Sequence, residues 1–188
     1  TDMDLEIIDV VPANIGEAGS TTVPAHTLYD IVRKLPEDST INITLHDNKS
    51  SITLTAGRSS YKLGCLPRED FPEMAANKAA NSFTVPASTL RNLIDRTRFA
   101  MSTEETRYYL NGIYIHNAQD SDGPMLRAVA TDGHRLARFQ VPLPEGAAGM
   151  PGVILPRKAV LELRRLLDEA ADTIRIDASE KMVRFTFD

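Results

Sequence analysis

Asp132 and His134 are the side chains in this sequence whose types and spacing most resemble an acid–base pair or a metal site. A carboxylate and an imidazole this close can move a proton or hold a metal ion. The other histidines have no metal-ligand spacing, and Cys65 is the single cysteine. The sequence has no glycine-rich phosphate loop and no nucleophile elbow. A metal-dependent hydrolase using Asp132 and His134 stays as an alternative, whereas the sequence favours a protein without catalytic residues, metal or cofactor.

Arginine and lysine side chains indicate a second kind of chemistry, the binding of phosphate groups. Of the 21 basic residues, nine fall in three segments predicted to be helical, at 24–35, 86–101 and 156–167. Of the 26 acidic residues, only three fall there, so the net charge of −5 conceals three basic helices. A basic surface built from equivalent helices would hold phosphates without reading sequence, because no base-reading motif is present. The acidic remainder would steer DNA toward that surface.

The elements that position these side chains repeat along the chain. The segment TVPAHTL at 22–28 recurs as TVPASTL at 84–90 and, more weakly, as ILPRKAV at 154–160. Proline favours the first helical position and keeps its predecessor extended, so each copy predicts a strand followed by a helix. Alternating apolar residues then predict hairpins with polar connectors at 47–49 and 179–181. This repeat of strand, helix and antiparallel strands predicts an α+β fold with helices on one face of the sheets.

The repeat also predicts two domains, at about 1–78 and 81–188. The sequence begins on a strand pattern at residues 1–7 and ends within another at residues 183–188. We therefore expect the second half of a first domain, a second domain that lacks its last strand, and no third domain. The sequence has neither a signal peptide nor an apolar run long enough for a membrane helix, and a single cysteine suits a reducing compartment. These features favour a cytoplasmic location without membrane binding.

Two motifs carry a resemblance to a known family. The segment RYYLNG at 107–112, followed by AVATDGHRLA at 128–137 and LPRKAV at 155–160, resembles the bacterial DNA sliding clamp, the beta subunit of DNA polymerase III. The resemblance covers essentially the whole chain. It implies a ring of two subunits joined head to tail, each with three similar domains, with helices lining the hole and sheets forming the outer wall. It also implies a processivity factor that encircles double-stranded DNA and tethers the polymerase without breaking any bond.

The resemblance further implies a hydrophobic groove that captures short peptides from polymerase subunits, the clamp loader and repair proteins. The matching positions are Arg107, Leu110, Thr131, Gly133, His134, Arg135 and Leu136. Leu110 and Leu136 would offer apolar walls, and Gly133 would let a peptide backbone approach closely. His134 and Arg135 would bind polar groups of the peptide. The family completes this groove with residues that would follow position 188, so we expect half of it here.

The DNA-facing residues follow from helical periodicity together with the resemblance. They are Arg33, Arg91, Arg98, Tyr108, Tyr109, Arg157, Lys158, Arg164 and Arg165. The loop at 102–109 resembles the family's DNA-touching loop, where Tyr108 and Tyr109 would stack on bases or pack against sugars. The alternative is that one tyrosine of the pair belongs to the core. Glu104 and Glu105 make this loop more acidic than a DNA contact would favour.

The homodimer contact implied by the resemblance uses an edge strand and a helix face of the first domain. Its positions are Ile31, Leu35, Arg58, Tyr61 and Leu63. Ser60 stands where this rim would carry a basic residue. A peptide-binding adaptor that does not contact DNA remains a second alternative, and salt-dependent retention on DNA would distinguish it from a clamp.

Overall fold

The computed structural model describes residues 5–47, 50–72, 81–169 and 172–187. The chain forms two compact units, Thr1–Met74 and Ala75–Asp188, and each is considered by itself. Among the described residues, no helix has the length and apolar character needed to cross a membrane. The predicted connector at 47–49 and the predicted strand at 1–7 lie partly outside these residues. Over Leu5–Ile7 the predicted strand is wrong, because this segment joins no ladder of backbone hydrogen bonds among the described residues.

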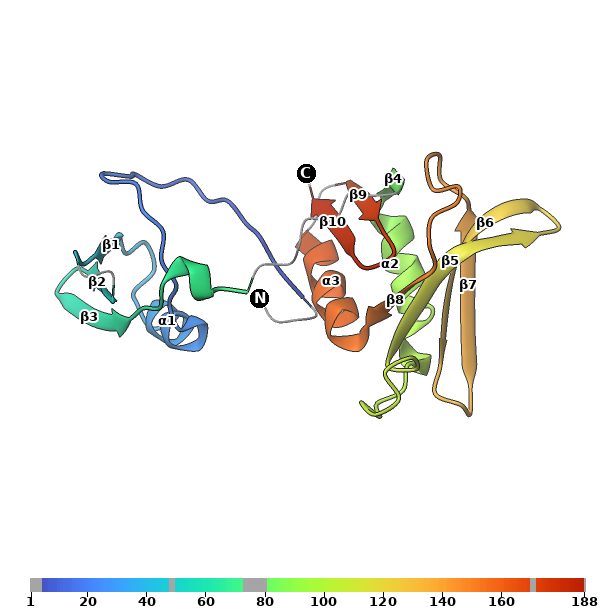
Figure 1. Cartoon of the computed structure of the whole chain (residues 1–188), viewed down its shortest axis with the longest axis horizontal. Helices are drawn as coiled ribbons and strands as arrows, with labels where there is room; N and C mark the ends of the chain where they lie inside the picture. The colour runs from blue at the N-terminus through green and yellow to red at the C-terminus, as the bar shows by residue number, and fades with distance from the viewer. Residues whose placement is uncertain (1–4, 48–49, 73–80, 170–171, 188) are drawn as a thin grey trace. The chain divides into compact units, whose positions relative to one another are not determined.

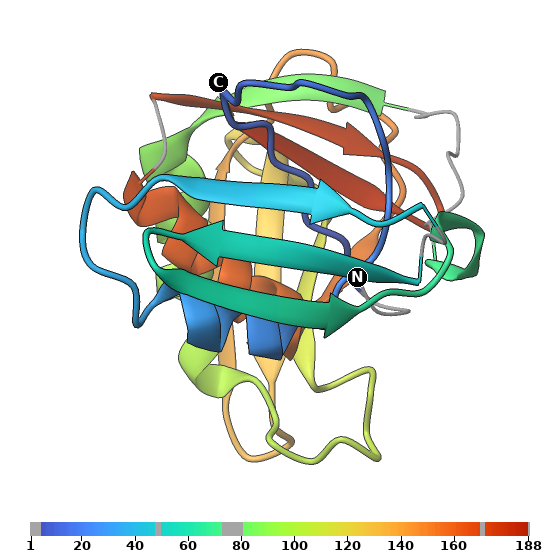
Figure 2. The ribbon, with the colours of Figure 1, turned by 90° about the vertical axis from the view of Figure 1, so that its left-hand side faces the viewer.

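Over its described residues, the first unit has one α-helix, one short 3-10 helix and a three-stranded antiparallel sheet in the order β1-β2-β3 (Figure 2). Its elements are α1 (Ala25–Val32), β1 (Ile41–Leu45), β2 (Ser51–Ala56), β3 (Ser59–Gly64) and the short 3-10 helix η1 (Arg68–Asp70). Ala56 pairs with Ser59, so only two residues connect β2 to β3. Gly57 has a φ of 57°, which a two-residue hairpin requires and glycine adopts without strain. Ile52, Leu54 and Leu63 form the buried centre of this unit.

In the part of the second unit that the structure describes, there are two antiparallel sheets and two α-helices, and these helices lie side by side (Figure 1). In chain order its elements are β4 (Asn81–Pro86), α2 (Ala87–Asp95), η2 (Arg98–Ala100), β5 (Gly112–Asp120), β6 (Gly123–Thr131), β7 (Leu136–Pro142), β8 (Val153–Pro156), α3 (Arg157–Glu169), β9 (Thr173–Ala178) and β10 (Val183–Phe187). The sheets have the orders β10-β9-β4 and β7-β6-β5-β8, and both helices contact the second of them. The predicted α+β architecture is confirmed. The repeated helix and hairpin are also confirmed, as α1 with β1–β2 and α3 with β9–β10. The strand predicted before the first helix is wrong, because residues 22–24 form no strand, whereas β4 and β8 precede α2 and α3.

The prolines that open the helices stand one position earlier than predicted. Pro24 and Pro86 have helical φ values of −63° and −57° but extended ψ values of 107° and 139°, so they are N-cap residues. The carbonyl oxygen of Pro24 accepts the first helical hydrogen bond, from the N–H of Leu28, at 3.0 Å. The helix predicted over 86–101 also ends early, at Asp95. There the hydroxyl of the buried Thr97 donates to the Leu93 carbonyl at 2.6 Å, and a turn of 3-10 helix follows.

The apolar faces of α2 and α3 decide which sides of the helices stay available for charged residues. Leu90 and Ile94 of α2 and Val160, Leu163 and Leu167 of α3 are buried in the core of the second unit, as their spacing predicts. This core continues into the strands through residues such as Ile113, Leu126 and Ile174. The helices are therefore fixed in rotation, and their arginines lie on the remaining faces.

Candidate peptide-binding and DNA-facing surfaces

The segment between β6 and β7 is a tight turn closed by the side chains of Thr131 and Asp132. Thr131 pairs with Leu136 at the ends of the two strands, leaving residues 132–135 as the loop. The Asp132 carboxylate accepts hydrogen bonds from the backbone N–H groups of His134 and Arg135, each at 3.0 Å. It also accepts one from the side-chain Nε–H of Arg135, at 2.9 Å. The Thr131 hydroxyl donates to the Arg135 carbonyl at 2.7 Å and accepts the Gly133 N–H at 3.1 Å. The loop is thus organised by its own residues.

These hydrogen bonds hold the pKa of Asp132 at about 2, below its ordinary value of 3.8. The backbone N–H of His134 is the largest cause, followed by that of Arg135, because both favour the charged carboxylate. Three of the roughly four lone-pair sites of this carboxylate are therefore used by the turn itself. Among the described residues, no group of three or more histidine, cysteine, aspartate or glutamate side chains is placed to bind a metal. The spacing of Asp132 and His134 is explained by the local fold.

Gly133 brings the turn into contact with a second segment of the predicted groove. Its φ of 91° lies in the left-handed region, which residues with a Cβ rarely adopt. A Cβ built on Gly133 would lie 4.0 Å from Nη1 of Arg107, so the end of the arginine side chain is a neighbour of the glycine. The Nε of Arg107 also pairs with the carboxylate of Glu104, at 3.0 Å. Two stretches that are 26 positions apart in the sequence thus meet at this glycine.

The loop that carries Arg107 is closed at its base, which fixes Leu110 beside strand β5. The Ser102 N–H donates to the Leu110 carbonyl at 2.9 Å, and the Asn111 side chain donates to the Ser102 carbonyl at 3.1 Å. Leu110 is half-buried, whereas Leu136 is 65% exposed. Leu136 therefore offers an apolar side chain to a partner, and Leu110 offers only part of its surface.

Phe99 is a neighbour of this region that the sequence reasoning missed. It lies on η2, is 57% exposed, and its ring lies beneath the guanidinium of Arg135, which is 5.7 Å from the ring centre. The sequence did contain a signal for Phe99. It is an aromatic residue that falls outside the apolar stripe predicted to be buried in 86–101, a position that favours exposure. The turn η2 that carries Phe99 contacts both strands of this hairpin, β6 and β7.

Both tyrosines of the loop at 102–109 are exposed, Tyr108 by 76% and Tyr109 by 57%. Their rings meet edge to face with centres 5.5 Å apart. The alternative that one of them belongs to the core is therefore wrong. Of the two acidic residues in this loop, Glu104 is paired with Arg107 and Glu105 is exposed.

The predicted DNA-facing arginines differ strongly in exposure. Arg33 and Arg165 have side chains exposed by 56% and 67%, and each pairs with an acid on its own helix, Asp30 at 3.3 Å and Glu162 at 3.1 Å. Lys158 is exposed, and Arg157 is partly buried at the start of α3. The outward position predicted for Arg164 is wrong, because its side chain is only 18% exposed. Helical periodicity placed it opposite the core, but α2 packs against that side of α3.

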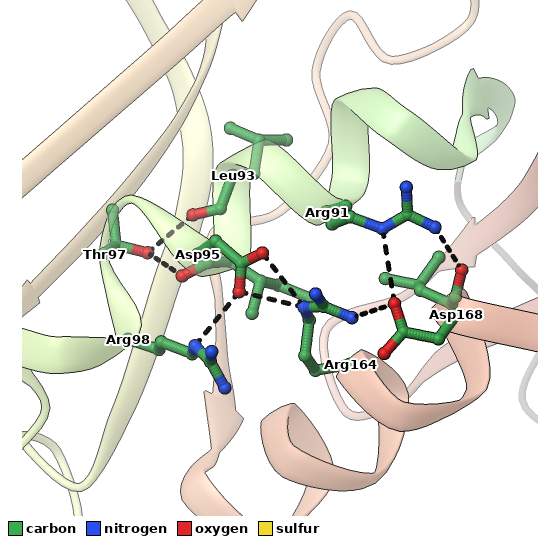
Figure 3. Close-up of polar contacts among 9 residues, drawn as sticks. Arg91, Leu93, Asp95, Thr97, Arg98, Arg164 and Asp168 are labelled. Carbon is green, nitrogen blue, oxygen red and sulfur yellow. Dashed lines mark hydrogen bonds and ion pairs between the residues drawn. The ribbon is translucent and has the colours of Figure 1, made fainter.

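Arg164 is the centre of an ionic network between α2 and α3 (Figure 3). Its Nε lies 2.9 and 3.0 Å from the two carboxylate oxygens of Asp95, and its Nη1 lies 2.6 Å from Asp168. Asp95 also pairs with Arg98 at 3.0 Å. Arg91 donates to the carbonyl oxygen of Leu167 at 2.6 Å, and its Nε lies 3.8 Å from Asp168.

The network changes the ionisation of its members in the expected directions. The carboxylate of Asp95, and after it that of Asp168, raises the pKa of Arg164 above its ordinary value. The guanidinium of Arg164 is in turn the largest cause of the lowered pKa of Asp168. Asp168 falls outside the helix predicted at 156–167, so the sequence reasoning missed it. The sequence offered one signal for this pair, because Asp168 follows Arg164 by four positions and residues at that spacing are neighbours on a helix.

The residues predicted for subunit contact divide into three groups by exposure. Arg58 and Tyr61 are exposed, and β3 lies at one edge of its sheet. Ile31 and Leu35 are half-buried, and Ile31 packs against the core of the first unit. The expectation for Leu63 is wrong, because only 5% of this residue is exposed. Leu63 pairs with Ile52 in the register of β2 and β3, which places it in the core.

Comparison with known proteins assigns both units to one family. The N-terminal domain of the DNA polymerase III beta subunit matches residues 1–75, and its central domain matches residues 84–188. The beta sliding clamp of Caulobacter vibrioides is 49% identical over 187 residues, covering 100% of this chain and 50% of the relative. That of Escherichia coli K12 is 37% identical over 185 residues, covering 98% and 49%.

Solved structures agree with this assignment. A sliding clamp of Bartonella birtlesii, bound to griselimycin, has a TM-score of 0.88 at 50% identity, covering 95% of this chain and 47% of that one. A DNA polymerase III beta subunit of Pseudomonas aeruginosa has a TM-score of 0.78 at 40% identity, covering 94% and 47%. The chain spans about half the length of the curated relatives it matches. With these matches across both units, the chain belongs to the family of the bacterial DNA polymerase III beta subunit, the beta sliding clamps.

Proposed function

We propose that this chain is part of a DNA sliding clamp, a non-catalytic processivity factor that encircles double-stranded DNA and tethers the replicative polymerase to it. The observation that carries the proposal is the arrangement of α2 and α3. Their apolar faces are buried against a sheet, and arginines lie on the remaining faces. Such a surface binds phosphates regardless of base sequence, as a ring that slides along DNA requires. The proposal places the protein in the bacterial cytoplasm.

The two units correspond, in this proposal, to two clamp domains. The first unit is the second half of the N-terminal domain, at about 1–78, and the second unit is the central domain, at about 81–188. Exposed Arg58, in the turn before β3, and exposed Tyr61, on this edge strand, then belong to the contact with a second subunit in a homodimeric ring. The free edge of this strand supports that role, because unpaired backbone groups can extend a sheet across an interface.

The turn at 131–136 and the loop at 102–111 form, in the same proposal, part of a binding site for short peptides of polymerase subunits, the clamp loader and repair proteins. Three observations support this role. Leu136 is an exposed apolar side chain at the start of β7, the end of the Arg107 side chain lies beside Gly133, and Arg135 is fixed by Asp132. Preorganised polar groups beside an apolar anchor are typical of peptide sites.

The decisive experiment compares retention on circular and on linearised plasmid, using the protein at the full length of its relatives. A ring held by topology stays on the circle and leaves the cut ends of the linear form. Equal retention on both would mean that contacts hold the DNA, and the clamp proposal would be wrong. Peptide binding without any retention on either DNA would support the adaptor alternative.

A further inference from the structure

The arginines of the α2–α3 pair carry less free positive charge than their number suggests. Arg91, Arg98 and Arg164 share two carboxylates, those of Asp95 and Asp168 (Figure 3). Three positive charges thus face two negative ones within salt-bridge distance. The two aspartates also reach solvent, because their side chains are exposed by 32% and 62%. A phosphate group that approaches this surface would therefore meet carboxylates as well as guanidinium groups.

The same pairing occurs on the other basic helix faces. Arg33 pairs with Asp30 on α1, and Arg165 pairs with Glu162 on α3. Of the arginines predicted to face DNA, Arg157 forms no ion pair with the residues that the structure describes. A paired arginine gains little by exchanging a carboxylate for a phosphate, because one ion pair is broken for each one formed. The pairing therefore weakens the attraction of these helices for DNA.

We propose that Asp95 and Asp168 are positioning residues that hold Arg91, Arg98 and Arg164 away from DNA phosphates, so that the helix pair grips duplex DNA weakly. The inference rests on the proposed clamp function. It adds to that function the means by which a basic surface binds DNA weakly enough to slide along it. The paired arginines join α2 to α3, while the remaining positive charge keeps the DNA near the surface. Loss of a carboxylate should accordingly tighten the grip and slow sliding.

The experiment compares Asp168→Asn and Asp95→Asn with Glu145→Gln, in the protein at the full length of its relatives. Glu145 is exposed in the connection between β7 and β8, so its variant makes the same change in net charge away from the two helices. Affinity for a linear duplex is measured from 50 to 200 mM salt, and the diffusion of the loaded ring is followed on single DNA molecules. Each freed arginine should add about one phosphate contact, and hence about a threefold greater loss of affinity across that salt range.

The proposal is supported if both aspartate variants bind tighter at low salt, show the steeper salt dependence and diffuse more slowly than Glu145→Gln. A purely structural role would lower the melting temperature and leave the salt dependence unchanged, which would overturn it. Asp168→Asn keeps Arg164 paired with Asp95, so this variant decides the question even if Asp95→Asn does not fold. Failure of the clamp function itself appears separately, as equal retention of the unsubstituted protein on circular and linear DNA.

Discussion

The carboxylate of Asp132 binds Arg135 twice, through the backbone N–H at 3.0 Å and through Nε at 2.9 Å. Backbone and side chain of this arginine are thereby fixed by one neighbour three positions earlier. The guanidinium is then placed over the ring of Phe99. A single aspartate thus connects the geometry of the turn to the surface offered to a peptide.

Asp132 makes the stability of the hairpin depend on pH. Its pKa is about 2 in the folded protein and 3.8 ordinarily, so its contribution is complete above pH 3.8 and declines as the pH falls toward 2. At pH 5 to 7 the free energy of unfolding should therefore be higher for the unsubstituted protein than for Asp132→Asn. This difference should shrink steadily below pH 4 in denaturant titrations. A difference that stays constant down to pH 2.5 would contradict the assignment.

Gly133→Ala should lower stability by about 1 kcal/mol, because the residue has a positive φ. Gly149→Ala is the matched control, since Gly149 has a φ of 75° and nothing within 4 Å of an added Cβ. Both variants should melt earlier. Only Gly133→Ala should also weaken peptide binding, because Gly133 lies in the candidate groove beside Arg107. Equal peptide affinity of the two variants would mean that Gly133 is not part of the peptide-binding groove.

His134→Ala and Leu136→Ala should each weaken the binding of a partner peptide that carries leucine and phenylalanine anchors. The expected loss is about 1–3 kcal/mol, the usual range for an interface anchor. Calorimetric titration of the peptide into the protein at the full length of its relatives measures it. Leu161→Ala removes a 45% exposed leucine from α3 and serves as the control. Unchanged affinity in both groove variants, with folding intact, would remove these residues from the site.

Arg164→Met should destabilise the second unit far more than Arg165→Met. Arg164 is 18% exposed and binds both Asp95 and Asp168, so its loss should cost about 1.5–3 kcal/mol. Arg165 is 67% exposed and pairs with Glu162 alone, so its loss should cost less than about 1 kcal/mol. Denaturant unfolding of the two variants compares them directly. Equal costs would mean that the network between α2 and α3 contributes nothing to stability.

The double variant Arg33→Glu with Arg165→Glu should reduce retention on circular DNA and processivity, with little change in stability. Both side chains are more than half exposed, and phosphate binding carries no sequence information. The loss should therefore be similar on every DNA sequence. Arg175→Glu with Arg184→Glu makes the same charge change on exposed positions of β9 and β10. An equal loss in this control would indicate a general effect of net charge.

Local patterns in the sequence determined the elements and the motifs of this protein. The VPA and LPR segments located the starts of three helices, and apolar spacing located the buried faces of α2 and α3. The motifs RYYLNG and TDGHRL located the loop and the turn that carry the candidate groove. These features were predictable because proline geometry, helical periodicity and turn formation each depend on residues within a few positions of one another.

The tertiary structure alone decided which polar and apolar side chains remain available for binding. Arg164 points away from the hydrophobic stripe of its own helix but is covered by α2 and bound by Asp95. Leu63 lies on an edge strand but is buried through its pairing with Ile52. Arg107 reaches Gly133 across a long stretch of sequence, and Asp95 reaches Arg164 across 69 positions. Periodicity predicts the direction in which a side chain leaves its own helix or strand. Its exposure depends on whether another element packs against that side.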